Sequence, residues 1–224
     1  MKIYKWLIFY VIMISCNQSQ EKKEQGAFII DVFRKLPIIG ISLDIKYELL
    51  TQIRIDSTKE NLQYAIDIDS INNSILIQSS IAGCYGSSCP YNNYYIKSFK
   101  VNNELYKIVL SNCLIVPGNN SQEQFDIFDY YLSSKLLMKD TVSYPALNIQ
   151  LKDFFNINTP DSIIDKLKDN ITPTYSFNND LLYCVISDYG DNYGILDNKW
   201  LEGNTIEIKW NGKYFVRSRI ILIK

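Results

Sequence analysis

The sequence contains no histidine among its 224 residues. This absence excludes Ser-His-Asp and Cys-His catalytic systems, the most common general base near neutral pH, and every zinc site that needs an imidazole ligand. Glycine is scarce at 9 residues, and neither G-x-G-x-x-G nor G-x-x-x-x-G-K-S/T occurs, so a glycine-rich phosphate loop is excluded as well. An enzyme built on this chain would have to use carboxylate, lysine, tyrosine or cysteine side chains. We expect no cofactor, and we favour a protein that is not an enzyme.

The chain also lacks a marked charge of either sign, with 23 basic and 24 acidic residues. This balance gives no electrostatic signature of a nucleic-acid partner. Repeats, low-complexity blocks and a proline-rich hinge are missing too, so we expect residues 27–224 to form a single globular domain. The 17 tyrosines and many asparagines are typical of carbohydrate-binding sites, although an AT-rich genome would encode the same composition.

The N-terminus changes abruptly from apolar to polar at Cys16. Two lysines, Lys2 and Lys5, precede an apolar run over residues 6–14, which is the order of segments in a secretory signal. The run is about half as long as the roughly 20 residues that a membrane-spanning helix needs. The pattern therefore predicts an export signal and not a transmembrane helix.

The end of this run, Met13-Ile14-Ser15-Cys16, resembles the lipobox of bacterial lipoproteins. The resemblance implies that residues 1–15 are a cleaved signal peptide and that Cys16 is acylated on its thiol and on its new amino group, for example with palmitate. Several acyl chains, at about 0.8 kcal/mol per methylene, would give stable membrane anchoring. Residues 16–26 would form a polar tether. The domain would then be held on the cell membrane or outer membrane, facing the periplasm or the exterior.

With one cysteine assigned to lipid attachment, four remain in the domain, and an even number in an exported domain predicts two disulfides. Cys84 and Cys89 enclose a loop, residues 85–88, that a local bridge could close, which would leave Cys113 to pair with Cys184. A turn at Asn102-Asn103 would alternatively bring Cys113 close to Cys89. The absence of any C-x-x-C pair argues against a redox site or a zinc site.

Two loops are candidate binding surfaces, one around Cys84 to Tyr95 and one over residues 187–200, because aromatic residues in loops are enriched at interfaces. The candidate residues are Tyr85, Tyr91, Tyr94, Tyr95, Asp188, Tyr189, Asp191, Tyr193 and Trp200. The second loop lacks the spacing of an EF-hand, and an ordinary turn explains its Asp, Asn and Gly residues better than calcium binding does. We therefore expect no metal.

Hydrophobic periodicity predicts an α+β fold, either an antiparallel sheet or a partly closed β-barrel with about three short helices. Helices are expected over residues 28–36, over 122–138 after a capping box of Ser121 and Gln124, and over 160–170, with Thr159 before Pro160 at the first helical position. Alternating apolar residues predict a strand over residues 39–55, and a further strand is expected over residues 181–188. Hairpin turns are expected at Asn72-Asn73-Ser74, at Asn102-Asn103 and at Asn211-Gly212.

Three functions remain open. The first is a lipid-anchored binding module whose ligand is an envelope protein or a glycan; in general form the chain resembles small uncharacterised lipoproteins of Gram-negative bacteria. A narrower version is an immunity lipoprotein that neutralises an exported toxin, which predicts a toxin gene next to its own. The third is a carboxylate-dependent hydrolase of envelope polysaccharide, in which side chains drawn from Asp188, Asp191, Glu202 and Glu207 would line one cleft.

Overall fold

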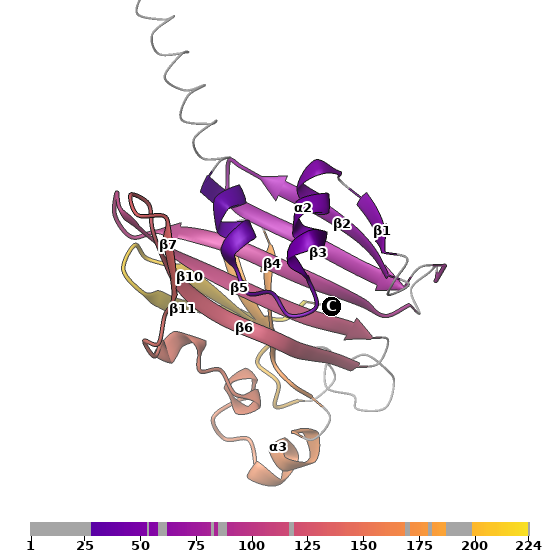
Figure 1. The fold of residues 1–224 in the computed structure, drawn as a ribbon. Helices are drawn as coiled ribbons and strands as arrows, with labels where there is room; N and C mark the ends of the chain where they lie inside the picture. The colour runs from indigo at the N-terminus through magenta and orange to yellow at the C-terminus, as the bar shows by residue number, and fades with distance from the viewer. Residues whose placement is uncertain are drawn as a thin grey trace, which may run out of the picture.

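The computed structural model describes residues 28–52, 54–57, 62–81, 83–84, 89–116, 119–168, 171–178, 181–186 and 199–223. These residues form three layers, in which two helices cover one face of a seven-stranded antiparallel sheet and a four-stranded antiparallel sheet packs on the other face (Figure 1). The predicted α+β class with an antiparallel sheet is confirmed. Neither sheet closes into a barrel within the described ranges.

The strands of the large sheet lie in space in the same order as in the sequence. They are β1 (Arg54–Ser57), β2 (Leu62–Asp69), β3 (Ser74–Ile81), β4 (Tyr91–Lys100), β5 (Leu105–Val116), β6 (Asn119–Tyr131) and β7 (Leu136–Lys139). The small sheet has the order β11, β10, β9, β8, formed by β8 (Thr174–Asn178), β9 (Leu181–Val185), β10 (Thr205–Trp210) and β11 (Phe215–Ile221).

Helices are short and lie outside the sheets. One helix covers residues 28–35, and the others are α2 (Leu43–Thr51), the 3-10 turns η1 (Pro145–Leu147) and η2 (Leu151–Phe154), and α3 (Asp161–Leu167). The predicted helices near residues 28–36 and 160–170 are confirmed, although Pro160 is the N-cap of the second and not its first helical residue. In the part of the chain that the structure describes, no helix has the length and apolar character needed to cross a membrane.

Two separate hydrophobic cores lie on the two faces of the large sheet. The first core joins the two N-terminal helices to side chains such as Ile77, Ile96 and Leu110. The second core lies between the sheets and includes Val109 and Ile208. Because Val109 and Leu110 are neighbours on β5 and both are fully buried, this strand is covered on both faces.

Burial on both faces explains the first difference from the sequence prediction. Residues 122–138 were expected to form a helix, but they belong to β6, a turn and β7. Phe128 and Tyr130 enter the first core while Ile127 enters the second. A strand that is buried on both faces does not alternate between apolar and polar residues. The spacing of the large apolar side chains in β6 and β7 therefore resembles that of a helix, and the helix prediction is wrong.

The second difference is at residues 39–55, where a strand was expected and α2 is found, followed by β1. Ser42 caps the helix, since its hydroxyl accepts a hydrogen bond from the Ile45 N–H at 3.3 Å. Leu43 and Tyr47 point outward, with 55 % and 53 % of their surface exposed, whereas Leu49 is buried. Some of the alternating apolar side chains of this segment therefore enter the core, and others face the solvent.

All three predicted hairpins and the predicted strand near residues 181–188 are confirmed. Asn73 adopts a positive φ of 49° in the turn between β2 and β3. In the next hairpin, the side chain of Asn102 accepts hydrogen bonds from the N–H groups of Glu104 and Leu105. Gly212, with φ of 94°, lies in the turn between β10 and β11. Asparagine and glycine favour these turns because they tolerate positive φ or bond their own backbone.

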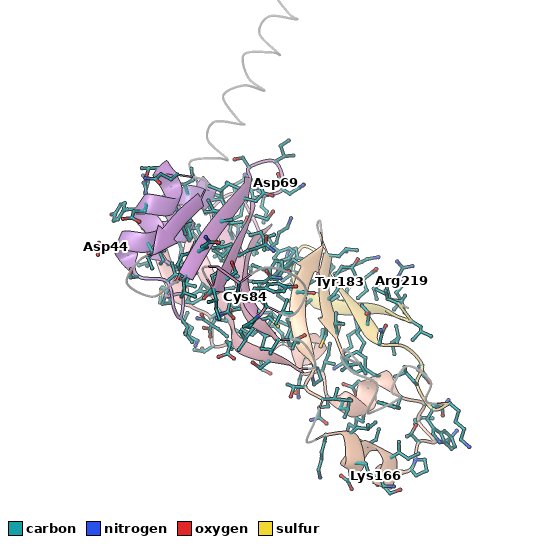
Figure 2. The ribbon with its side chains drawn as sticks, turned by 90° about the vertical axis from the view of Figure 1, so that its right-hand side faces the viewer. Asp44, Asp69, Cys84, Lys166, Tyr183 and Arg219 are labelled. Atoms are coloured by element: carbon teal, nitrogen blue, oxygen red, sulfur yellow. A yellow bond between two sulfur atoms is a disulfide. The ribbon has the colours of Figure 1, made fainter. Side chains whose placement is uncertain are left out.

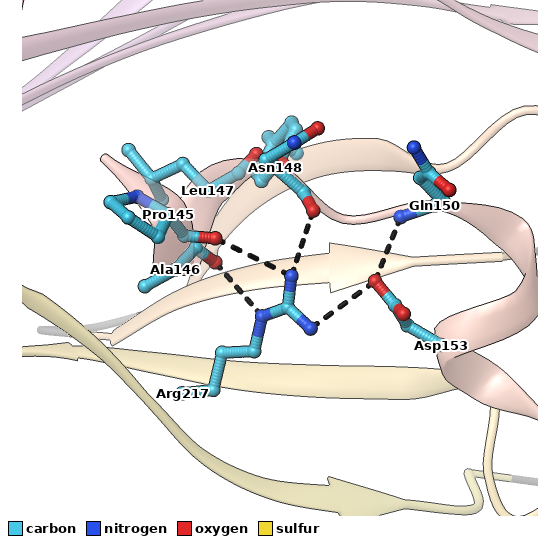
Figure 3. Close-up of polar contacts among 8 residues, drawn as sticks. Pro145, Ala146, Leu147, Asn148, Gln150, Asp153 and Arg217 are labelled. Carbon is cyan, nitrogen blue, oxygen red and sulfur yellow. Dashed lines mark hydrogen bonds and ion pairs between the residues drawn. The ribbon is translucent and has the colours of Figure 1, made fainter. Parts of the chain in front are cut away.

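Arg217 of β11 holds the segment between the two sheets in place (Figure 3). Its guanidinium donates to the carbonyls of Ala146 at 3.2 Å and Asn148 at 2.8 Å, and it lies 3.2 Å from the carboxylate of Asp153. That carboxylate also accepts the Gln150 N–H at 3.0 Å. One side chain thus joins η1 and η2 to the edge of the small sheet.

Candidate functional site

The large sheet is wider than the layer that packs on its second face. Seven strands spaced about 4.8 Å apart span about 29 Å, whereas four strands span about 14 Å. The small sheet contacts β4, β5 and β6 through β8, and Figure 2 shows it, marked by Tyr183 and Arg219, to one side of the large sheet. Among the described residues it leaves β2 and β3 open, and Asp67 and Gln78 on this face are exposed.

The open part of this face carries mostly polar side chains. On β2 to β4, the alternate residues Ile66, Ile77 and Ile96 enter the helix-covered core, so their neighbours point to the opposite face. These neighbours form four cross-strand rows: Gln63 with Ser80 and Tyr91; Ala65 with Gln78 and Asn93; Asp67 with Leu76 and Tyr95; and Asp69 with Ser74 and Lys97. We call these residues the polar strip. Successive rows are about 7 Å apart along the strands.

Two hollows open along the polar strip, each with a volume of about 270 Å³. The first hollow is at the end near the disulfide, where its lining includes Gln63, Gln78, Ser80, Tyr91 and both bonded cysteines. The second hollow is near the turn between β2 and β3, where its lining includes Asp67, Leu76, Tyr95 and Phe177. Phe177 belongs to β8, and its ring lies 6.2 Å from that of Tyr95. The edge of the small sheet therefore forms one wall of the second hollow.

A chain of hydrogen bonds fixes the polar groups between the two hollows. The Gln78 side-chain amide donates to Asn93 Oδ1 at 3.3 Å, and Asn93 Nδ2 donates to the Tyr95 hydroxyl at 3.0 Å. Asn93 is only 6 % exposed, and burial raises the pKa of Tyr95 further above neutral pH. The network therefore presents amide and hydroxyl groups in a fixed arrangement before any ligand arrives.

Charge differs between the two hollows. None of the described residues that line the first hollow is charged. In the second hollow, Asp69 accepts the N–H groups of Ile71 and Asn72, each at 3.0 Å, and the bond from Asn72 is the main reason why the pKa of Asp69 is lowered. The side chain of Asp67 is exposed and, within the described ranges, its carboxylate makes no hydrogen bond or ion pair. It is the carboxylate that remains open to a ligand.

The predicted aromatic residues do not all reach this surface. Tyr91 and Tyr95 lie in the polar strip, whereas Tyr94 is 3 % exposed and belongs to the helix-covered core. Trp200 packs at the margin of the core between the sheets. The remaining candidates lie outside the described residues: Tyr85, Asp188, Tyr189, Asp191 and Tyr193. So does Cys16.

Sequence reasoning missed the polar half of the site, namely Gln63, Asp67, Gln78 and Asn93. The alternation of β2 contained a signal for Gln63 and Asp67, since each lies between apolar residues that face the core. The sequence did not indicate that the opposite face stays open.

The predicted local disulfide is confirmed between Cys84 and Cys89, with the sulfurs 2.08 Å apart. The predicted second bridge is wrong, because Cys113 and Cys184 are both buried free thiols. Cys113 contacts Thr174 and Cys184 contacts Tyr175. The two thiols therefore contact different side chains of β8. The alternative bridge from Cys113 to Cys89 is excluded because Cys89 is already bonded.

Two of the four carboxylates considered for a glycoside hydrolase, Glu202 and Glu207, are among the described residues. The side chain of Glu207 is completely buried, lies 2.9 Å from Lys209 and 3.1 Å from Arg219, and has a lowered pKa, mainly through its hydrogen bond with Lys209. A general acid for this reaction needs a raised pKa. Glu202 is exposed, and Asp188 and Asp191 lie outside the described residues. Within the described ranges, no three metal-ligating side chains converge.

Comparison with known protein families, curated proteins and solved structures found no match to this chain.

Proposed function

We propose that this protein is a lipid-anchored binding module of the bacterial cell envelope and that its ligand lies along the polar strip. One observation carries the proposal: the face of the large sheet is open at β2 and β3, and the polar strip there holds amide, hydroxyl and carboxylate groups along two hollows. An open sheet face that served only for solubility would need no hydrogen-bonded amide network. Groups that are ordered before binding lose less entropy when the ligand arrives.

The envelope location rests on the resemblance of Met13-Ile14-Ser15-Cys16 to a lipobox. Loss of Lys2 and Lys5 with the signal would leave 21 basic against 24 acidic side chains. Electrostatic attraction to an anionic membrane would then be weak, so the acyl chains would have to supply the attachment. Cys16→Ala should abolish incorporation of radiolabelled palmitate and leave the precursor uncleaved. Unchanged palmitate labelling would contradict lipid attachment at Cys16.

The polar strip is tested by blocking it without removing a hydrogen bond. Ala65 lies in the second row and lines the first hollow, so Ala65→Trp should fill the hollow and prevent binding. The wild type, Ala65→Trp and Gln52→Ala would be used to capture ligands from envelope extract; Gln52 is exposed at the end of α2. We expect a ligand that the wild type and the Gln52 variant retain and that the Ala65 variant loses. Equal capture by all three proteins would show that the polar strip is not the binding surface.

A further inference from the structure

We infer that the polar strip binds an uncharged glycan chain that carries acetamido groups. The inference rests on the proposed function, since it assigns a ligand class to the same surface. It is carried by the different chemistry of the two hollows and by their separation along the strands.

The first hollow suits a polyhydroxylated ligand. Its lining offers the amides of Gln63 and Gln78 and the hydroxyl of Ser80, which together provide both donors and acceptors. Sugar hydroxyls are also both donors and acceptors, so they can pair with such groups on both sides. The ring of Tyr91, 36 % exposed at the end of the row, adds an aromatic surface for the apolar face of a sugar.

The second hollow suits an acetamido group. Asp67 provides an exposed acceptor for an N–H, while Leu76, Tyr95 and Phe177 provide apolar contact for a methyl group. A hydrogen bond to a charged acceptor is stronger than one between neutral groups. The negative charges of Asp67 and Asp69 exceed the single positive charge of Lys97 in the last row, so they disfavour a phosphate or carboxylate at this position. An N-acetylated sugar combines the N–H and the methyl group without a negative charge.

The spacing of the hollows favours a chain over a single sugar. The first hollow is lined by the rows of Gln63 and Ala65 and the second by the rows of Asp67 and Asp69, so the two hollows are displaced by four residues along β2. Four residues of a strand span about 13 Å, which is longer than one monosaccharide.

An extended peptide fits this surface less well than a glycan does. Peptides that bind to sheets gain most of their affinity by pairing with the backbone of an exposed edge strand. Here β3 and β4 have a partner strand on both sides, and β2 pairs with β3 along its whole length but with β1 only over residues 62–65. Among the described residues of these three strands, the outer edge of residues 66–69 is therefore the one stretch without a strand partner, and it is short for an extended peptide. Recognition must come from side chains, as it does for a sugar.

The test uses the full chain in detergent and three trisaccharides with the same β-1,4 linkage: N,N′,N″-triacetylchitotriose, its deacetylated form and cellotriose. Binding is measured by isothermal titration calorimetry. We expect the acetylated trisaccharide to bind at least about tenfold more tightly than cellotriose, because a charge-assisted hydrogen bond is lost without the acetamido group. Tighter binding of the deacetylated form would show that Asp67 selects a cation, and it would overturn the acetamido assignment.

Variants link the binding to the two hollows. Asp67→Ala should weaken binding of the acetylated trisaccharide about tenfold, and Asp67→Asn, which keeps an acceptor oxygen, should weaken it less. Asp165→Ala is the control, since Asp165 is exposed on α3 and pairs only with the exposed Lys168. Ala65→Trp should abolish binding. An equal affinity of the Asp67 variants and the wild type would contradict the inference.

The outcomes separate the inference from the proposed function. If no trisaccharide binds but Ala65→Trp still loses a ligand from envelope extract, the binding module stands and the glycan assignment fails. If the trisaccharide binds and Ala65→Trp binds it equally well, both the polar strip and the inference fail.

Discussion

Lys107 is buried on the second face of the large sheet and lies between two carboxylates. Its Nζ is 2.6 Å from Asp129 Oδ1 and 2.6 Å from Asp140 Oδ2, and the Tyr144 hydroxyl donates to the same oxygen of Asp140 at 2.6 Å. Burial raises the pKa of Asp140, but its hydrogen bonds with Lys107 and Tyr144 outweigh burial and hold the pKa below its usual range. The ion pair between Lys107 and Asp140 joins the end of β7 to the start of β5.

This pairing predicts acid sensitivity. A carboxyl group whose pKa is lowered by folding stabilises the protein above its unfolded pKa, and this contribution is lost as the pH falls through the folded value. Asp140→Asn should therefore lower the free energy of unfolding by about 2 kcal/mol at pH 7 and much less near pH 2. Urea denaturation at the two pH values measures the difference. A loss of equal size at both values would contradict an electrostatic role.

The two free thiols are predicted to be inert in the native protein. Burial raises the pKa of Cys113 to about 11 and that of Cys184 to about 12, so almost no thiolate is present at pH 8. Iodoacetamide at pH 8 should label neither residue in the folded protein and both in urea, as read by peptide mass mapping. Rapid labelling of Cys113 in the folded state would mean that β8 opens from the large sheet.

At the scale of elements, α2 depends on a cap that hydrophobic periodicity does not reveal. The Ser42 hydroxyl accepts the Ile45 N–H, and the helix end buries Leu49 against the sheet. Ser42→Ala should therefore cost about 1 kcal/mol of stability, whereas Ser42→Asp should retain most of it because aspartate also caps helices. Chemical denaturation of both variants measures this. If the aspartate variant is as unstable as the alanine variant, the Ser42 cap does not stabilise α2.

The elements that could be predicted are those with local causes. Asn73, Asn102 and Gly212 set turns through their own backbone or side chains, and the strands of β2 and β3 alternate because only one of their faces is packed on a core. The strand β6 could not be recognised, because both of its faces are covered by segments distant in sequence. Because both faces are buried, its sequence does not show the apolar-polar alternation typical of a strand.

At the scale of the molecule, one sheet is shared by two cores. Leu110 and Val109 are adjacent on β5 and serve different cores, so the loss of one core should destabilise the other. Leu110→Ala should cost about 3 kcal/mol. Because Trp200 and Trp210 pack against the second core, tryptophan fluorescence reports on the core that the substitution does not touch.

We expect fluorescence and far-ultraviolet circular dichroism to give the same lowered midpoint for Leu110→Ala. Coincident transitions measured by different probes indicate a single cooperative unit. A circular dichroism transition that moves while the fluorescence transition stays in place would show that the two cores unfold independently.

The residues of the polar strip could also be predicted only in part from the sequence. The disulfide and two of its neighbours, Tyr91 and Tyr95, could be proposed from the sequence because they lie in one recognisable segment. The contribution of Asp67 and Gln78 could not, because their exposure depends on the small sheet being narrower than the large one. Relative sheet width is a property of the whole fold.

The sequential order of the large sheet also has a consequence for biosynthesis. Its strands can pair one after another as the chain emerges N-terminus first, so the polar strip is complete once β4 has paired. By contrast, Phe99, Val109 and Ile127 must wait for β8 to β11 before they are covered. A chain that has only partly emerged presents a bare apolar surface, which is the form that chaperones retain and that aggregates when they are absent. The last quarter of the chain therefore decides whether a nearly finished molecule stays in solution.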